Sequence, residues 1–331
     1  MKALPVCVIG AGSWGTALAM VLAAQGRAVR LLARSEDQAQ AMQHARCNTR
    51  YLPESSFPDS LTVMHDFTQA TAGVAAVVLA VPSHAATPFL LQLAPLNMPV
   101  IAAFKGFQHE GGDSAEALLR RHLGDGRSLI LSGPSFAKEV AQGLPTAMTL
   151  AATDLSLAKA IAELFHHGHF RIYVSNDMVG VAMGGSLKNI IAIAAGVAEG
   201  LHLGHNAMAA LVTRGMVEIS RLAYCFGARS ETLNGLSGLG DLVLTCTGSL
   251  SRNRKMGMAL AHGMSVDAAR QHVGQVVEGE MAAHIALSLA RAHQIEMPIT
   301  EAVCRLLIGE LTAKEAVGIL LERPSATELV D

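Results

Sequence analysis

The sequence predicts an α/β protein: a doubly wound sheet over residues 1–175, followed by an all-helical domain over residues 176–331. Three observations predict this fold. Apolar runs alternate with helical segments over the first half of the chain, which is typical of a parallel sheet with helices on both faces. A glycine-rich turn joins the first strand to the first helix. Beyond about Asn176, the strand signals fade and helical runs dominate.

The glycine-rich turn lies between an expected strand at residues 4–9 and an expected helix at residues 16–24. Gly10, Gly12 and Gly15 form the pattern G-x-G-x-x-G. The first glycine permits a tight turn, the second lets a pyrophosphate approach the backbone, and the third lets the helix pack against the strand. The helix N-terminus offers N–H groups and a positive dipole end to phosphates. Because the motif joins a strand to a helix, it indicates a Rossmann-type dinucleotide site rather than a merely structural turn.

Further buried strands are expected at six places, and the run at 74–81 (VAAVVLAV) has the valine-rich pattern of a strand covered on both faces. Ligands of such sheets bind outside the carboxyl ends of the strands. Arg34, Lys105 and Ser135 all fall at such ends. The expected strands are 28–33, 74–81, 100–104, 129–131, 146–151 and 170–174, and the expected later helices are 187–199, 207–224, 265–272, 279–293 and 300–307.

Arg34 occupies the position where a domain that binds NAD would place an acidic side chain for the ribose 2′-hydroxyl. An arginine there favours a 2′-phosphate. We therefore expect the cofactor to be NADP or NAD, with a preference for NADPH. The alternative is a solvated arginine at a strand end. Glu36 lies close by in the sequence and keeps NAD possible.

The composition excludes several classes of protein. Hydrophobic residues make up 51% of the 331 residues and charged residues 16%, so a large core can be buried. A net charge of −2 gives no broad attraction to nucleic acid or anionic membranes, and 4% aromatic residues leave little for base stacking. The five cysteines form no C-x-x-C pair, which favours a reduced, cytoplasmic setting without structural zinc or disulfides. No apolar run approaches the ~18 residues of a membrane-spanning helix.

Lys188 is the first candidate for chemistry. On a helix it shares a face with four small residues, Gly184, Gly185, Ala192 and Ala195. Small neighbours would leave room for a ligand, and apolar surroundings disfavour the charged amine and lower its pKa toward the range used in acid–base catalysis. The alternative is a lysine that extends its amine to solvent.

Two later segments carry polar groups that suit a small phosphorylated ligand. Asp241 follows a glycine-rich stretch, NGLSGLG, and could pair with Lys188, bind a substrate hydroxyl or cap a helix. The segment Ser251-Arg-Asn-Arg254 combines guanidinium, amide and hydroxyl groups that suit a phosphate. The alternative for this segment is a solvated basic turn. Earlier in the chain, three histidines lie close together in the sequence, at His166, His167 and His169. They lack the carboxylate or cysteine that would complete a metal site.

Taken together, these segments resemble the bacterial NAD(P)-dependent sn-glycerol-3-phosphate dehydrogenases over essentially the whole chain. The resemblance rests on ten short motifs in the same order. These are GAGSWGTALA from Gly10, NTRYLP from Asn48, AVPSH from Ala80, FKGF from Phe104, SGPSFAKEV from Ser132, GGSLKNIIAIAAG from Gly184, GHNAMAALVTRG from Gly204, GLSGLGDLVLTC from Gly235, SRNR from Ser251 and VVEG from Val276.

The resemblance implies roles for the matching positions. The dinucleotide would contact Ser13, Trp14, Arg34, Lys105, Ala137, Arg252, Val276 and Glu278, in addition to the glycine-rich turn. Glycerol phosphate would contact Lys105, Gly133, Ser135, Lys188, Asp241, Ser251, Arg252 and Asn253. Lys188 would be the acid–base group, with Asp241 orienting it.

The function that these roles imply is the interconversion of dihydroxyacetone phosphate and sn-glycerol 3-phosphate with NAD(P)H, without a metal. The resemblance also implies a cytoplasmic homodimer, without membrane insertion or a nucleic-acid partner, that supplies glycerol 3-phosphate for phospholipid synthesis. Two alternatives remain open at this point. One is another hydroxyacid dehydrogenase of the same domain plan, and the other is a non-catalytic dinucleotide-binding sensor.

Overall fold

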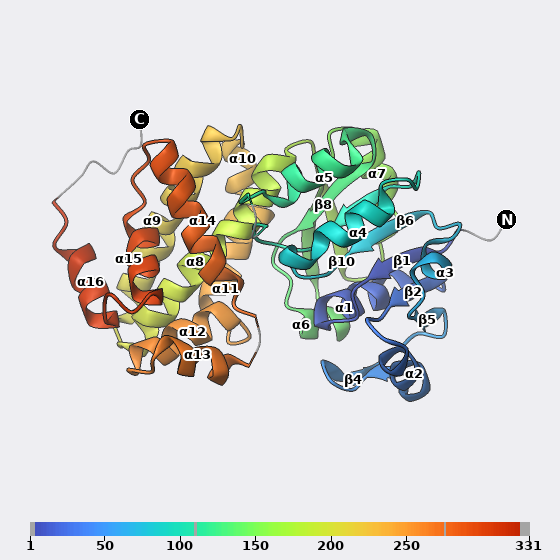
Figure 1. Ribbon diagram of the computed structural model, residues 1–331, viewed down its shortest axis with the longest axis horizontal. Helices are drawn as coiled ribbons and strands as arrows, with labels where there is room; N and C mark the ends of the chain where they lie inside the picture. Colours follow the sequence, from blue (N-terminus) through green and yellow to red (C-terminus); the bar gives the residue numbers. More distant parts are fainter. Residues whose placement is uncertain (1–3, 109–110, 275, 325–331) are drawn as a thin grey trace. The chain divides into compact units, whose positions relative to one another are not determined.

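The computed structural model describes residues 4–108, 111–274 and 276–324 (Figure 1). The chain divides into two compact units. The first contains residues 1–105 and 115–178, and the second contains residues 106–114 and 179–331. The boundary expected from the sequence, after residue 175, differs from this division mainly because residues 106–114 leave the first unit and belong to the second.

Within the described residues, the first unit is built on an eight-stranded sheet in the order β10-β9-β8-β7-β6-β1-β2-β5. All neighbouring strands are parallel except β8 and β9. The strands are β1 (Val6–Ile9), β2 (Val29–Leu32), β5 (Leu61–Met64), β6 (Ala76–Leu79), β7 (Val100–Ala102), β8 (Ser128–Ser132), β9 (Thr146–Ala151) and β10 (Phe170–Ser175).

The sequence predicted this doubly wound sheet, but it missed β5 and the reversal at β9. The reversal has a physical cause. The only helix between β8 and β9 is α6, which has five residues, and so short a helix cannot carry the chain back along the length of a strand. A separate antiparallel pair, β3 (Cys47–Asn48) and β4 (Leu52–Ser56), was also not expected.

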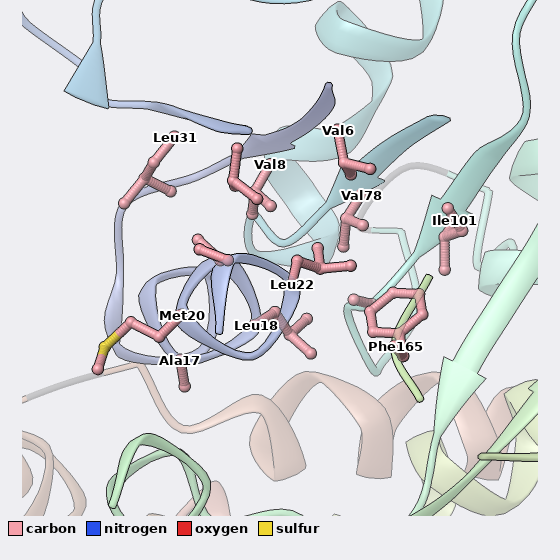
Figure 2. Packing of buried hydrophobic residues seen from close by; sticks show 14 of the residues in the cluster. Val6, Val8, Ala17, Leu18, Met20, Leu22, Leu31, Val78, Ile101 and Phe165 are labelled. Atoms are coloured by element: carbon pink, nitrogen blue, oxygen red, sulfur yellow. The ribbon is translucent and has the colours of Figure 1, made fainter. Parts of the chain in front are cut away.

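Helices pack on the sheet through alternate strand residues. Val6 and Val8 of β1 point toward Leu18 and Leu22 of α1, in a cluster that also contains Phe165 (Figure 2). The helices of the first unit are α1 (Ser13–Ala23), α2 (Glu36–Ala45), α3 (Phe67–Thr71), α4 (Ala86–Leu93), α5 (Ala115–Leu123), α6 (Ala137–Ala141) and α7 (Leu155–Ala162), with 3₁₀ turns at Ser83–Ala85 and Asp125–Arg127.

From residue 179 on, the second unit is built from helices over its described residues. Its helices are α8 (Met178–Gly200, whose first residue belongs to the first unit), α9 (Gly204–Cys225), α10 (Ser230–Leu233), a π-helical turn (Leu236–Gly240), α11 (Asp241–Thr247), α12 (Arg252–Ala261), α13 (Val266–Val273), α14 (Glu278–Ala292), α15 (Pro298–Leu307) and α16 (Ala313–Leu321). The sequence did not predict α12 or α16 as helices. Several starts follow capping chemistry; at α16, Thr312 and Glu315 form a capping box.

The sequence predicted no apolar segment close to the length of a membrane-spanning helix, and α8 shows that this prediction was wrong. Among the described residues it is the one helix long and apolar enough to cross a membrane by length and composition. Its glycines, Ser186 and Lys188 interrupt the apolar run, which is why the sequence reading passed over it. The window is 89% buried inside the structure, as in the core helix of a helical bundle.

Candidate active site

The glycine-rich turn between β1 and α1 has the shape that a pyrophosphate needs. Gly10 has a φ of +111°, and a Cβ there would lie 2.6 Å from the carbonyl oxygen of Ala80. A Cβ at Gly15 would lie 1.9 Å from the carbonyl oxygen of Gly10, so helix and turn meet only because this residue is glycine. At Gly12, in contrast, a Cβ would meet nothing within 4 Å. The open space at Gly12, beside a helix N-terminus, fits a dinucleotide phosphate.

The other expected dinucleotide contacts in the first unit lie on the elements around this turn. Ser13 and Trp14 begin α1, and the indole Nε1 of Trp14 donates to the carbonyl of Ala103 at 2.8 Å. Arg34 is exposed after β2, and its backbone N–H donates to Gln38 Oε1 at 3.2 Å. Ala137 is half-buried at the first position of α6.

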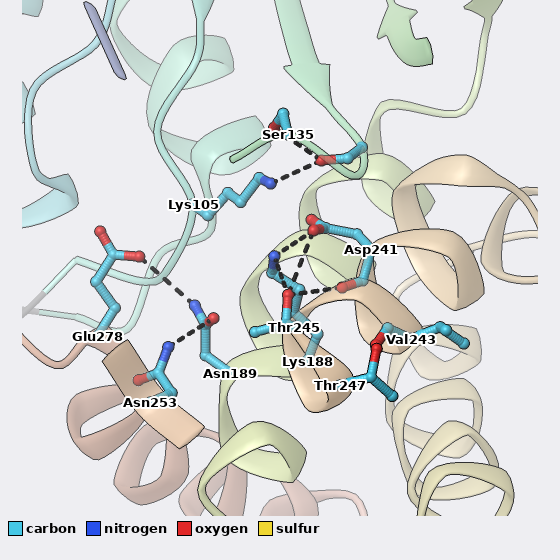
Figure 3. A network of polar contacts seen from close by, with 11 residues as sticks. Lys105, Ser135, Lys188, Asn189, Asp241, Val243, Thr245, Thr247, Asn253 and Glu278 are labelled. Atoms are coloured by element: carbon cyan, nitrogen blue, oxygen red, sulfur yellow. Dashed lines mark hydrogen bonds and ion pairs between the residues drawn. The ribbon is translucent and has the colours of Figure 1, made fainter. Parts of the chain in front are cut away.

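Three expected substrate residues come together in the first unit. Lys105 follows β7 and its Nζ donates to the carbonyl of Gly133 at 3.0 Å (Figure 3). Ser135 Oγ donates to the same carbonyl, also at 3.0 Å. Because β7 and β8 are parallel, their carboxyl ends meet at one edge of the sheet. The sequence placed Lys105 and Ser135 at the carboxyl ends of strands, and in the structure both side chains donate to the same carbonyl at that edge of the sheet.

In the second unit, Lys188 is buried rather than extended to solvent. It is 6% exposed, and its Nζ forms an ion pair with Asp241 Oδ1 (Figure 3). The amine also donates to Thr245 Oγ1 at 2.7 Å. Thr245 Oγ1 in turn donates to the backbone carbonyl of Asp241 at 2.6 Å, so its lone pairs remain oriented toward the lysine. Asp241 and Thr245 therefore fix the position of the amine.

The small face of α8 explains how this pair forms. A Cβ at Gly184 would lie 2.8 Å from the carbonyl oxygen of Ser237, so the π-helical turn lies directly against the helix. This turn leads straight into Asp241, the first residue of α11, which is therefore brought to Lys188 by backbone packing. The expectation that the small residues leave room for a ligand was wrong at Gly184, because that space holds protein backbone.

Thr245 is a functional candidate that sequence reasoning missed. It lies four residues after Asp241 on the same helix, and residues so spaced share a face. That spacing was the available signal. The neighbouring Cys246 contributes no charge, since burial raises the pKa of its thiol to about 12.

The segment from Ser251 begins α12 rather than forming a basic turn. Ser251 is the N-cap, and its side chain accepts from the N–H of Arg254 at 3.2 Å. Arg252 is exposed at the first helical position. Helix N-termini attract anions, so the segment combines a guanidinium with a positive dipole end.

Asn253 is buried and links three helices. Its Nδ2 donates to Asn189 Oδ1 at 2.9 Å (Figure 3). Its Oδ1 accepts from the N–H of Gly279 at 3.0 Å. Glu278 begins α14, and its Oε2 accepts from Asn189 Nδ2 at 3.5 Å. Val276 is 51% exposed. The sequence indicated no role for Asn189, the residue after Lys188. In the structure its side chain connects α8, the helix of the lysine, to α12 and α14.

These residues form no metal centre. Over the described ranges, with gaps at 109–110 and 275, no three His, Cys, Asp or Glu side chains gather into a set that could hold a metal ion.

Comparison with known proteins adds the family. The family described as NAD-dependent glycerol-3-phosphate dehydrogenase matches with its N-terminal part at residues 5–158 and its C-terminal part at residues 177–318. The chain belongs to this family. A curated relative from Thioalkalivibrio sulfidiphilus, named glycerol-3-phosphate dehydrogenase [NAD(P)+], is 48% identical over 99% of this chain and 100% of its own.

Other members of the family are similar to this chain in sequence and in structure. The relative of the same name from Halorhodospira halophila is 46% identical over 98% of this chain and 99% of its own. The crystal structure of glycerol-3-phosphate dehydrogenase from Coxiella burnetii is similar with a TM-score of 0.92 and 43% identity, covering 98% of this chain and 100% of that one. Membership of this family favours the expected activity over another hydroxyacid dehydrogenase or a non-catalytic sensor.

Proposed function

We propose that this glycerol-3-phosphate dehydrogenase family member interconverts dihydroxyacetone phosphate and sn-glycerol 3-phosphate with NAD(P)H, and that Lys188 is its acid–base group. The observation that carries the proposal is the buried Lys188 amine, held by Asp241 and Thr245 in a chain whose other unit carries a dinucleotide turn. A sensor that only binds a dinucleotide has no use for such an amine.

The dinucleotide is proposed to bind at the first unit through its glycine-rich turn, where the open space at Gly12 supports the assignment. Arg34 is proposed to contact a 2′-phosphate and to make NADPH the preferred cofactor; its exposure at the end of β2 supports this role. The further proposed contacts are Gly10, Ser13, Trp14, Gly15, Lys105, Ala137, Arg252, Val276 and Glu278.

The chemistry follows from the charge that develops on the substrate. When bound, the nicotinamide supplies a hydride to the carbonyl carbon of dihydroxyacetone phosphate, or accepts one from the alcohol in the reverse direction. Negative charge grows on the ketone oxygen, and Lys188 donates a proton to it. The alcohol then carries the new C–H and O–H bonds, and the neutral amine regains its proton from water. Asp241 stabilises the ammonium before the transfer, and Thr245 keeps it aimed.

The phosphate of the substrate is proposed to bind at the start of α12. Arg252 supplies a forked cation there and the helix supplies its positive end. Ser251 and Asn253 are also proposed substrate contacts, although in this structure Ser251 caps the helix and Asn253 holds α14. Lys105, Gly133 and Ser135 complete the proposed set. Binding energy gained at the phosphate aligns the carbon for reaction.

Four further assignments rest on the family resemblance. The enzyme is proposed to be a homodimer that acts in the cytoplasm, without membrane insertion, and that supplies glycerol 3-phosphate for phospholipid synthesis. Sedimentation of the purified protein at several concentrations tests the dimer, because a monomer at all concentrations would contradict it. Fractionation of cells into membrane and soluble parts tests the location.

The activity is tested by following the absorbance of NADPH, and separately of NADH, after dihydroxyacetone phosphate is added. We expect oxidation of both cofactors, faster with NADPH, and formation of sn-glycerol 3-phosphate. Dihydroxyacetone without phosphate is the control and should react far more slowly. Binding of NADPH without oxidation by any ketone would instead indicate a sensor.

A further inference from the structure

Asn48 is a buried polar residue that lies against the glycine-rich turn, and nothing above gives it a role. It ends β3 in the small antiparallel pair and is 1% exposed. Its Nδ2 donates to Thr16 Oγ1 at 2.8 Å and to the carbonyl oxygen of Ala11 at 3.1 Å. Ala11 directly precedes Gly12, and Thr16 lies near the start of α1 after it. One amide group therefore connects the turn to the following helix, around the position proposed to meet the pyrophosphate.

A second side chain reaches the same carbonyl. Gln38 of α2 donates from Nε2 to the Ala11 oxygen at 3.4 Å. Its Oε1 accepts from the backbone N–H of Arg34 at 3.2 Å. Gln38 thus connects the glycine-rich turn to the segment proposed to bind the 2′-phosphate, while Asn48 connects the turn to β3.

These contacts fix the direction of one peptide group. In a planar trans peptide the C=O and the following N–H point in opposite directions. Two donors that hold the Ala11 oxygen therefore also set the direction of the Gly12 N–H. A carbonyl turned toward a pyrophosphate would repel it, whereas an N–H turned toward it would bind it. We propose that Asn48, assisted by Gln38, is a positioning residue that presents the Gly12 N–H to the dinucleotide pyrophosphate.

The surroundings hold Asn48 in this orientation. Its Oδ1 accepts from the N–H of Tyr51 at 3.3 Å, which distinguishes the amide oxygen from the donor nitrogen. Arg46, two residues before Asn48, donates to the carbonyls of Leu61 at 3.0 Å and Pro58 at 2.6 Å, and so connects the start of the β3–β4 pair to the chain around β5. The donor therefore approaches the turn from an anchored segment.

The test compares NADPH with adenosine 2′-monophosphate, a fragment of it that lacks the pyrophosphate and the nicotinamide ribose. Binding of NADPH and of adenosine 2′-monophosphate is measured by titration of the Asn48→Ala variant, together with a thermal melt. We expect NADPH to bind about tenfold more weakly, as for one impaired hydrogen bond to a charged group, with binding of adenosine 2′-monophosphate nearly unchanged. The KM for NADPH should rise while kcat changes little.

The matched control is Ser60→Ala. Ser60 Oγ donates to the carbonyl of Ala23 at 2.9 Å, so this variant loses a hydrogen bond to the other end of α1. It should lower the melting temperature without the selective loss of NADPH binding. If Asn48→Ala weakens both ligands equally, or neither, the positioning role is wrong.

A second variant covers the case in which Asn48→Ala does not fold. Thr16→Val keeps the shape of a buried side chain but removes the hydroxyl that orients Asn48, and it should show the same selective loss to a smaller extent. Equal binding of both ligands by Thr16→Val and wild type would then overturn the role. The inference rests on the proposed dinucleotide function, which the wild-type titration tests separately. A wild type that does not bind NADPH contradicts both, whereas a binding wild type with unaffected variants contradicts only the role of Asn48.

Discussion

The two units build their polar sites from different materials. In the first unit, the core of the proposed dinucleotide site is a set of backbone groups at a glycine-rich turn, and Arg34, the cation proposed to contact a 2′-phosphate, is exposed. In the second unit, the central group is a charged side-chain pair, Lys188 and Asp241, that is almost completely buried. A backbone site depends on the shape of one local turn, whereas a buried ion pair depends on the packing of distant helices. Substitution of Gly12 or Arg34 should therefore change binding without changing stability, whereas substitution of Lys188 should change both turnover and stability.

The largest effect is expected for Lys188→Met. Turnover should fall by ~10²–10⁴, the range for loss of a positioned acid–base group. The fold should also lose about 3–5 kcal/mol, because Asp241 stays buried without its cation. The measurements are kcat, NADPH binding and a denaturant titration. Lys314→Met, at an exposed lysine of α16 in the same unit, is the control for removing a lysine.

A double variant then separates chemistry from stability. Lys188→Met combined with Asp241→Asn removes the uncompensated charge, so it should regain much of the lost stability and none of the turnover. If near-native kcat remains in either variant, Lys188 is not the acid–base group. If the double variant recovers both properties, the pair is structural.

The second prediction concerns another buried carboxylate of the helical unit. Glu218 of α9 accepts from the N–H groups of Ile299 and Thr300 at 2.6 and 3.0 Å, at the start of α15. Burial outweighs these hydrogen bonds and raises its pKa to about 7. A folded pKa above the unfolded value of 4.5 means that the folded state binds the proton more tightly. This contribution to stability, about 3 kcal/mol, is complete below the unfolded pKa and is lost as the pH rises through 7.

Glu218→Gln should remove this dependence, since glutamine stays neutral at every pH. The free energy of unfolding of wild type relative to the variant should therefore decrease as the pH is raised from about 5 to about 8. The decrease should be on the order of 3 kcal/mol, the free energy that corresponds to the pKa shift. Turnover at a fixed pH should be little affected, in contrast to the Lys188 variants. Parallel stability curves for the two proteins would contradict a titrating Glu218.

The third prediction tests the backbone site with one methyl group at two glycines. Gly15→Ala places its Cβ against the Gly10 carbonyl and should cost about 1–3 kcal/mol of stability, with loss of NADPH binding. Gly12→Ala meets open space, so the protein should melt normally and yet bind NADPH more weakly. Thermal melts and NADPH titrations of both variants check this. A Gly12→Ala variant with wild-type affinity would place the pyrophosphate elsewhere.

The same difference explains what the sequence could predict. A turn such as Gly10–Gly15 is encoded in adjacent residues, and the strand ends that gather Lys105 and Ser135 follow from a parallel sheet. The partner of Lys188 could not be selected in this way, because Asp241 reaches it through the packing of a π-helical turn on Gly184. The pairing stood only as one of several possibilities for that aspartate.

Local signals also failed where elements are short or polar. Strand β5 has four residues, LTVM, with no long apolar run to mark it. Helix α12 begins with Arg-Asn-Arg-Lys and contains Gly257, so its charges suggested a turn. Its N-cap, Ser251, was visible in the sequence but was assigned to phosphate binding. The family resemblance supplied candidate residues here, but not the helix that carries them.

The fourth prediction concerns Arg252 at the start of α12. If it binds the substrate phosphate, Arg252→Ala should lower kcat/KM for dihydroxyacetone phosphate by about ten- to hundredfold, as for a charged hydrogen bond of about 1.5–3 kcal/mol. Unlike Lys188, the side chain is exposed, so stability should hardly change. Dihydroxyacetone, which lacks the phosphate, should be reduced equally slowly by both proteins. Normal kinetics with the phosphorylated substrate would leave Arg252 as a solvated residue at a helix end.

The smallest effect is expected for Arg34, an exposed cation of the first unit. Arg34→Asp replaces a guanidinium that suits a 2′-phosphate by a carboxylate that suits a 2′-hydroxyl. We expect kcat/KM for NADPH to fall roughly tenfold or more while that for NADH is retained or rises. Arg34→Ala should lose the NADPH preference without gaining NADH binding, which separates attraction of the phosphate from repulsion by the new charge. Neither variant should change the melting temperature, because the Arg34 side chain is exposed and does not belong to a hydrophobic core. Equal losses with both cofactors would show that Arg34 shapes the turn before α2 rather than selecting the phosphate, and the backbone site would then carry no charged discriminator at this position.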